Sequence, residues 1–252
     1  GTPELAAHCL EDLILGGYRI AGVVTAPDKP AGRGRKILSS AVKQMAIEHN
    51  LPLLQPENLK DAGFLQDLRE LDAQLQVVVA FRMLPEAVWA APPMGTFNMH
   101  ASLLPQYRGA APINWAIING EKISGVSTFL IDHKIDTGRI LLRRSLELSD
   151  IETAGSLHEK LKPLAAAIIR DTIDGLAGNS LKAVDQDEFA SAVPLKIAPK
   201  IYRDTCRISW TLSCMETERL IRGLSPSPGA FCELVSQTGD IQIIRLIMGS
   251  AL

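Results

Sequence analysis

The run from Gln76 to Phe81 constrains the fold of this chain more than any other segment. Its centre reads VVVA, four apolar residues in succession with no polar alternation. A strand of this kind is buried on both faces, as in a parallel sheet that helices cover on either side. The run therefore predicts an α/β domain rather than a sandwich of two sheets.

Helical and extended patterns alternate on both sides of this run. Apolar residues recur at helical spacing from Leu5 to Ile14, and the pair Gly16-Gly17 ends that helix. Further helices are predicted at about 40–49, 57–71, 85–90, 112–119 and 154–176, and extended segments at 20–25, 51–55, 96–98, 126–131 and 139–146. This alternation is typical of a mostly parallel sheet.

The two ends of the chain predict incomplete elements. The sequence opens on Gly-Thr-Pro, where a first sheet strand would normally just have ended, so we expect that strand to be missing. We expect a catalytic domain at 1–177, a linker at 178–204 and a partial β-rich domain at 205–252. Within the last, a helix is predicted at 215–223 and extended segments at 207–210, 231–235 and 241–247. Two or three strands cannot close a barrel.

Composition excludes several classes of protein. Hydrophobic residues make up 46% of the 252 and the net charge is −2, so nothing global indicates nucleic acid or membrane, and a polyanion site must be a local patch. The four cysteines have neither CxxC pairing nor metal-ligand spacing, which favours reduced thiols in the cytoplasm and no metal site. No apolar run is long enough to span a bilayer. The phosphate-loop pattern GxxxxGK[ST] and the dinucleotide pattern GxGxxG are both absent.

The segment FNMHASLLPQYRGAAP, residues 97–112, is the most informative for chemistry. Side chains alternate along a strand, so Asn98 and His100 share one face where this strand ends. Carboxyl ends of parallel strands are where open α/β sheets bind ligands. An amide and an imidazole there can bind a developing oxyanion and move a proton. From these two residues alone, a core histidine and a turn asparagine explain the pattern equally well.

Asp136 makes the catalytic interpretation stronger. It lies in IDHKIDTGRILL, residues 131–142, a polar turn between two apolar strands. A carboxylate beside an imidazole fixes its tautomer and favours the imidazolium. Ordinary turn chemistry is the alternative for Asp-Thr-Gly. The same tripeptide occurs in aspartic proteases, but a single copy in an α/β context argues against that class.

The order and spacing of these motifs resemble one known family. N-x-H followed by SLLPxYRGAAP, with DTG downstream, is similar to the formyltransferases that use 10-formyltetrahydrofolate. Within it the pattern is most similar to the methionyl-tRNA formyltransferases. The resemblance covers essentially the whole chain and includes GTPE, APDKPAGRGRK (26–36), LPLLQPENL (51–59), VVVAFRMLPE (77–86), APKI (198–201), ISW (208–210) and PSPGAF (226–231).

The resemblance implies a Rossmann-like catalytic domain followed by a small β-barrel, OB-like domain. It implies that Asn98, His100 and Asp136 form the catalytic set of an active enzyme. It implies folate contacts from two segments, one formed by Ser102, Leu103, Leu104 and Pro105, the other by Phe81, Arg82, Met83 and Leu84. This chain reads FRMLP where many relatives carry a Tyr-Gly pair, which puts the pocket wall in doubt.

The basic loop PDKPAGRGRK, residues 27–36, is the second functional candidate. It carries Lys29, Arg33, Arg35 and Lys36 against Asp28 alone, and its Pro and Gly residues predict an irregular backbone. Charge alone favours a solvated surface loop. The resemblance implies instead a tRNA-contacting loop, with Arg33 as its main residue, because a basic loop suits phosphate contacts.

The resemblance thus implies transfer of a formyl group from 10-formyltetrahydrofolate to the free amine of initiator methionyl-tRNA, in translation initiation, by a monomer without a metal. One alternative is a related formyltransferase acting on a glycinamide ribonucleotide or an amino sugar. A second is a non-catalytic RNA-binding protein on the same scaffold. The basic loop and the second domain favour tRNA over the first, and the intact catalytic set argues against the second.

Overall fold

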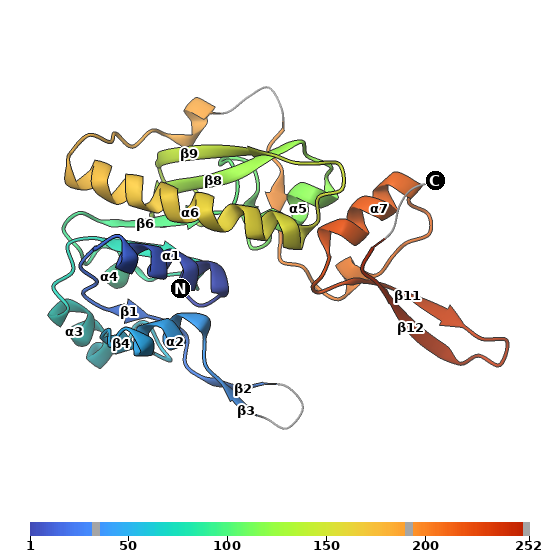
Figure 1. Ribbon diagram of the computed structural model, residues 1–252, viewed down its shortest axis with the longest axis horizontal. Helices are drawn as coiled ribbons and strands as arrows, with labels where there is room; N and C mark the ends of the chain where they lie inside the picture. The colour runs from blue at the N-terminus through green and yellow to red at the C-terminus, as the bar shows by residue number, and fades with distance from the viewer. Residues whose placement is uncertain (32–35, 190–193, 249–252) are drawn as a thin grey trace. The chain divides into compact units, whose positions relative to one another are not determined.

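A computed structural model describes residues 1–31, 36–189 and 194–248 (Figure 1). The chain forms two compact units, each built from three segments. Unit one comprises Gly1–His100, Ser127–Arg143 and Lys162–Glu188, and unit two comprises Ala101–Val126, Arg144–Leu161 and Phe189–Leu252. The units are described separately below. In the described residues, no helix combines the length and apolar character needed to cross a membrane.

The sheets of unit one contain both parallel and antiparallel strand pairs. Strands β1 (Val23–Val24) and β4 (Leu53–Leu54) form one parallel pair. A second sheet has the order β5-β6-β8-β9. Its strands are β5 (Gln76–Val79), β6 (Thr96–His100), β8 (Ile123–Leu130) and β9 (Ile140–Glu147). β6 pairs parallel with β5 and antiparallel with β8. The α/β class predicted from sequence is therefore confirmed.

Side-chain caps explain where two of the helices begin. Ser40 accepts a hydrogen bond from the Lys43 amide at 3.0 Å and so starts α2. Asp61 accepts one from the Phe64 amide at 3.0 Å and starts α3. Each cap satisfies an amide that has no partner inside the helix. The helices in the first segment of unit one are α1 (Glu4–Leu15), α2 (Ala41–Glu48), α3 (Ala62–Glu70) and α4 (Glu86–Trp89).

The long helix α6 (Ala154–Ala177) supplies much of the core. A stripe at helical spacing is fully or almost fully buried along it: Leu157, Leu161, Ala165, Ile168 and Thr172. Within unit one α6 lies beside α1, since Arg170 forms an ion pair with Asp12 at 3.1 Å. Its buried face packs on β8, where the hydroxyls of Thr172 and Thr128 are 2.8 Å apart.

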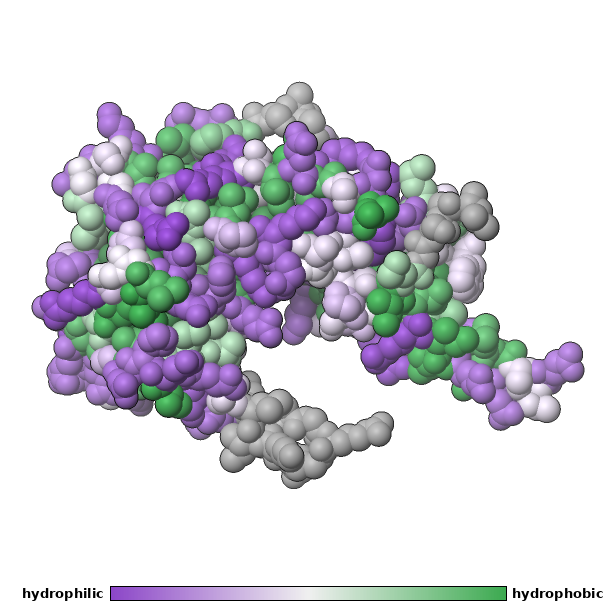
Figure 2. Space-filling view, in the orientation of Figure 1, coloured by the Kyte–Doolittle hydropathy of each residue, from purple (hydrophilic) through white to green (hydrophobic). Residues whose placement is uncertain are grey.

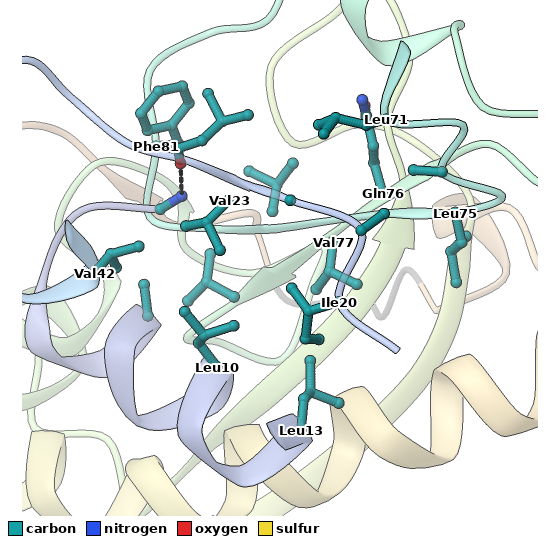
Figure 3. A pocket seen from close by; sticks show the side chains of 18 of the residues that line it. Leu10, Leu13, Ile20, Val23, Val42, Leu71, Leu75, Gln76, Val77 and Phe81 are labelled. Atoms are coloured by element: carbon teal, nitrogen blue, oxygen red, sulfur yellow. Dashed lines mark hydrogen bonds between the residues drawn. The ribbon is translucent and has the colours of Figure 1, made fainter. Parts of the chain in front are cut away.

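An apolar cleft of about 430 Å³ separates β1 from β5 (Figure 3). Val23 and Val77 line it from the two strands, and Leu10 and Leu13 line it from α1. Gly1 also lies here, and its amine donates a hydrogen bond to the Val24 carbonyl at 3.0 Å. In the described residues, β1 pairs with β4 alone and β5 with β6 alone.

Unit two is built around helices α5 (Pro112–Ile118) and α7 (Cys214–Gly223), which pack on each other. Strands β7 (Arg108–Gly109) and β10 (Ile197–Ala198) pair in parallel and join the segment after β6 to the predicted linker. A hairpin of β11 (Ala230–Val235) and β12 (Ile241–Leu246) follows α7. One hydrophobic core cluster of unit two consists of Cys206, Ile208, Leu220, Ile221, Leu224, Ala230, Phe231 and Cys232.

The outer part of the β11–β12 hairpin exposes apolar side chains, which Figure 2 shows as hydrophobic colour along this arm. Ile241, Ile243 and Ile244 are exposed on β12, and Val235 at the end of β11. These two strands do not close a barrel in the described part of unit two.

The basic segment differs from the irregular loop that its sequence predicts. Its arms pair as a short antiparallel hairpin of β2 (Lys29–Ala31) and β3 (Lys36–Leu38), in which Pro30 faces Ile37 (Figure 1). The turn between them lies outside the described residues. Pro punctuates the segment without preventing pairing, because Pro is compatible with an edge strand.

Candidate active site

Strand β6 fixes the placement of Asn98 and His100. Phe97 and Met99 are 0% and 3% exposed and face the core. Asn98 and His100 therefore share the opposite face, as the alternation predicts. Because β6 pairs with a strand on each side, its backbone is held along both edges. In this register Asn98 lies opposite Val78 on β5 and Phe129 on β8.

Asn98 carries a buried polar atom without a partner. Its side-chain oxygen forms no hydrogen bond to any described residue. An unpaired buried acceptor costs about 1–3 kcal/mol and is rare in folded proteins. This oxygen can therefore accept a hydrogen bond from a donor group of a bound substrate.

Asp136 adopts a left-handed backbone conformation, with φ of +54°. It lies in a turn that side chains close at its amino end. The Asp132 carboxylate accepts hydrogen bonds from the Lys134 amide at 2.9 Å and the Thr137 hydroxyl at 3.0 Å. A non-glycine residue in this region costs of order 1 kcal/mol or more, so the surrounding contacts must hold the turn.

The turn brings the Asp136 carboxylate to the His100 imidazole. His100 Nδ1 and Asp136 Oδ2 are 4.0 Å apart, and their side chains are 8% and 13% exposed. This separation is ion-pair range and longer than a direct hydrogen bond. Catalytic hydrogen bonds commonly tighten only when substrate is bound. His100 on β6 and Asp136 in the turn between β8 and β9 are thus brought together inside unit one, although they lie 36 residues apart in sequence, and Asn98 shares the strand face of His100.

A fourth residue of this site has no counterpart in the sequence prediction. Gln186 begins a short 3-10 helix (Gln186–Phe189) and is 4% exposed. Its side-chain amide donates to the Asp136 carbonyl at 2.9 Å and to the Gly138 carbonyl at 2.8 Å. The sequence places Gln186 in the linker, where no pattern distinguishes it from its polar neighbours.

Comparison with known families identifies the family of this chain. Residues 1–173 match the formyl transferase family and residues 200–251 match the formyl transferase C-terminal domain. The chain belongs to the formyl transferase family. It is 50% identical to the methionyl-tRNA formyltransferase of Bacteroides thetaiotaomicron over 246 residues, which are 98% of this chain and 76% of that protein. It is 51% identical to that of Parabacteroides distasonis over 248 residues, 98% of this chain and 76% of that protein.

Solved structures of formyltransferases share the fold. A 4-N formyltransferase from Francisella tularensis superposes with a TM-score of 0.71 at 15% identity, covering 97% of this chain and 94% of that one. A sugar N-formyltransferase from Shewanella superposes with a TM-score of 0.69 at 16% identity, covering 98% and 94%. These similarities extend the family's fold to this chain but say nothing of its acceptor.

In this formyltransferase, the segment from Phe81 to Leu84 is anchored from several sides. The Arg82 guanidinium donates to the Glu57 carbonyl at 2.7 Å and also to the Pro56 carbonyl. Phe81 and Leu84 pack partly against the core cluster around Leu59, Phe64, Leu68 and Val88. Met83 is 66% exposed. Of the four predicted folate contacts in this segment, Arg82 and Met83 are exposed, and Arg82 has structural partners.

The segment Ser102 to Pro105 belongs to unit two and is largely buried. Ser102 donates to the Gln106 carbonyl at 2.7 Å, and Leu104 is 0% exposed. Tyr107 follows, and its hydroxyl donates to the Glu121 carboxylate at 2.5 Å. Burial, with this hydrogen bond, raises the pKa of Tyr107. These contacts hold Tyr107 in its loop.

The predicted tRNA residues are only partly within the described structure. Lys29 and Lys36 lie on the paired strands β2 and β3, whereas Arg33 and Arg35 lie outside the described residues. Within the part of the chain that is described, no cluster of His, Cys, Asp and Glu could hold a metal ion.

Proposed function

We propose that this formyltransferase moves the formyl group of 10-formyltetrahydrofolate to the free amine of initiator methionyl-tRNA. The observation that carries the chemistry is the meeting of Asn98, His100 and Asp136 at the end of β6. The relatives that are about 50% identical over 98% of the chain support the acceptor. The sugar N-formyltransferase from Shewanella shares the fold at only 16% identity, which does not favour a sugar acceptor.

The proposed reaction needs no covalent enzyme intermediate. The amine nitrogen bonds to the formyl carbon, an oxyanion forms, and the bond from that carbon to N10 of the folate then breaks. Asn98 and the imidazolium of His100 donate to the oxyanion. One such donor is typically worth about 10²–10³ in turnover.

Asp136 orients His100 and takes up the proton that the attacking amine releases. The unpaired oxygen of Asn98 can accept a hydrogen bond from that amine, while its amide group donates to the oxyanion. One carboxamide would then hold both reacting partners. His100 or a relayed water returns a proton to N10.

The test is formylation of charged initiator tRNA with 10-formyltetrahydrofolate. His100→Ala and Asp136→Asn should each reduce turnover at least about 10²-fold while folate binding is kept. His49→Ala is the matched control, since His49 is exposed at the end of α2. Near-normal turnover in either site variant contradicts the catalytic assignment.

The acceptor is tested with three substrates side by side: charged initiator tRNA, a glycinamide ribonucleotide and an amino sugar nucleotide. Formylation of either small acceptor, but not of tRNA, would replace the proposal with its alternative. Binding of tRNA without any formyl transfer would support a non-catalytic RNA-binding protein.

The basic segment is proposed to contact tRNA phosphates through Lys29, Arg33, Arg35 and Lys36. Arg33→Ala should weaken the use of tRNA and flatten its salt dependence, because one phosphate contact is lost. Slow hydrolysis of the folate without tRNA should be unchanged. Equal losses in both assays would show that the loop acts structurally. We further propose a monomeric, cytoplasmic enzyme, which sedimentation and fractionation test.

A further inference from the structure

The turn that carries Asp136 is held at its carboxyl end by one side chain from a distant segment. Gln186 lies 50 residues beyond Asp136 and 48 beyond Gly138, and it bonds both carbonyls at once. A primary amide has two N–H donors in a fixed plane, so this geometry uses both of them. The amide thereby fixes the distance between the Asp136 and Gly138 carbonyl oxygens, which lie on either side of Thr137.

We propose that Gln186 is a positioning residue for formyl transfer: its amide holds Asp136 in the left-handed conformation that directs the carboxylate to His100. This inference rests on the catalytic roles proposed above for Asp136 and His100. Gln186 touches no reacting atom itself and acts through the backbone of the turn.

The two hydrogen bonds of Gln186 match the backbone strain of Asp136 in energy. The left-handed backbone of Asp136, at φ +54°, costs of order 1–2 kcal/mol. Two buried amide-to-carbonyl hydrogen bonds contribute about 0.5–1.5 kcal/mol each. They are therefore of the size needed to offset the strain, and without them the turn can relax.

The rest of the turn shows why its carboxyl end depends on Gln186. Asp132 closes the amino end through Lys134 and Thr137. Gly138 has no side chain that could hold this end of the turn, and none fits, since a Cβ there would lie 1.7 Å from the Leu130 carbonyl oxygen. The chain then enters β9, and Ile140 is bridged to Val184 through amide hydrogen bonds of 2.8 Å. That bridge brings the segment of Gln186 beside the turn.

The test compares Gln186→Met, which keeps the length of the side chain and removes both donors, with Glu188→Gln as control. Glu188 is exposed in the same 3-10 helix. Gln186→Met should lower kcat about 10- to 100-fold with little change in the KM of either substrate. Glu188→Gln should leave both constants unchanged.

A double-mutant cycle separates positioning from general destabilisation. In the Asp136→Asn background, Gln186→Met should reduce kcat no further, because both act on one carboxylate. An additional reduction equal to that in the wild type would overturn the proposal. Gln186→Glu adds a graded variant: its carboxyl can donate one hydrogen bond only when protonated, so turnover should recover as pH falls, relative to wild type.

Ring ¹⁵N NMR of His100 tests the geometry without any activity. Gln186→Met should shift the ring signals in the direction that Asp136→Asn shifts them, while the His49 signals stay fixed. Unchanged His100 signals with a fall in kcat would overturn the inference. If Asp136→Asn keeps full turnover, the proposed catalytic role of Asp136 fails, yet the ring signals still decide whether Gln186 positions the carboxylate.

Discussion

A buried pair of threonine hydroxyls between β8 and α6 allows a quantitative test of the core. Thr128 and Thr172 are both 0% exposed, and their hydroxyl oxygens are 2.8 Å apart. Thr172 also donates to the Ile168 carbonyl at 2.6 Å. A hydroxyl has only one hydrogen to donate, so Thr128 must donate to Thr172.

This direction makes the two single substitutions unequal. Thr172→Val leaves the Thr128 hydroxyl buried without an acceptor, which costs about 1–3 kcal/mol. Thr128→Val removes one hydrogen bond but leaves Thr172 bonded to Ile168, which costs about 0.5–1.5 kcal/mol. The double variant replaces both partners by apolar groups of similar shape and should come within about 1 kcal/mol of wild type.

The measurement is urea unfolding of the four proteins, followed by tryptophan fluorescence and by far-ultraviolet circular dichroism. The midpoint should fall most for Thr172→Val and recover in the double variant, with the slope unchanged. A double variant as unstable as the sum of the two singles would refute the assigned direction and the idea that the unpaired hydroxyl is the cost.

Three further predictions concern unit two, the thiols and the site. Burial raises the pKa of Glu152, but its ion pair with Lys160 and its serine hydrogen bonds outweigh this effect and hold that pKa below its usual value. The stabilisation from these contacts is therefore complete above about pH 4.5 and is lost as pH falls through the lowered pKa. Glu152→Gln should then cost about 1–3 kcal/mol of folding free energy at pH 7, and less at acid pH, in urea titrations. Cys214 is the exposed thiol, whereas burial, with Asp12 nearby, raises the pKa of Cys9 to about 12; a thiol reagent should modify Cys214 first in the native protein, and Cys214→Ser should remove that fast phase. Asn98→Val removes the unpaired buried acceptor and should stabilise the fold by about 1 kcal/mol while abolishing formylation, seen by comparing unfolding midpoints with turnover.

Helices and strands whose apolar residues recur at a regular spacing were predictable, because the residues at that spacing are the ones that are buried. The helix predicted at 154–176 is α6, Ala154–Ala177, since its buried stripe repeats at helical spacing. The helix predicted at 57–71 begins only at Ala62, because Asp61 caps it and the preceding residues form a turn. The hairpin of β2 and β3 was not predicted, because its strands lack an alternating apolar pattern and, among the described residues, pair only with each other.

The proposed catalytic residues were predictable to the extent that local rules place them. Alternation along one strand puts Asn98 beside His100, and a polar turn between two apolar strands singles out Asp136. Gln186 obeys no local rule, because its role arises from a contact across 50 residues. Nor does the sequence reveal that Asp136 is left-handed or that the Asn98 oxygen has no hydrogen-bond partner in the described part of the chain.

Two energetic costs therefore lie at the same end of β6. A buried acceptor with no partner among the described residues opposes folding by about 1–3 kcal/mol, and a left-handed aspartate by about 1–2 kcal/mol. Both persist because β6 is paired on each side and because Asp132 and Gln186 hold the turn at its two ends. In the proposed reaction, groups held in this way do not have to reorganise when charge develops on the formyl oxygen, so we expect the cost met during folding to lower the barrier. A site relaxed by stabilising substitutions should lose turnover for the same reason.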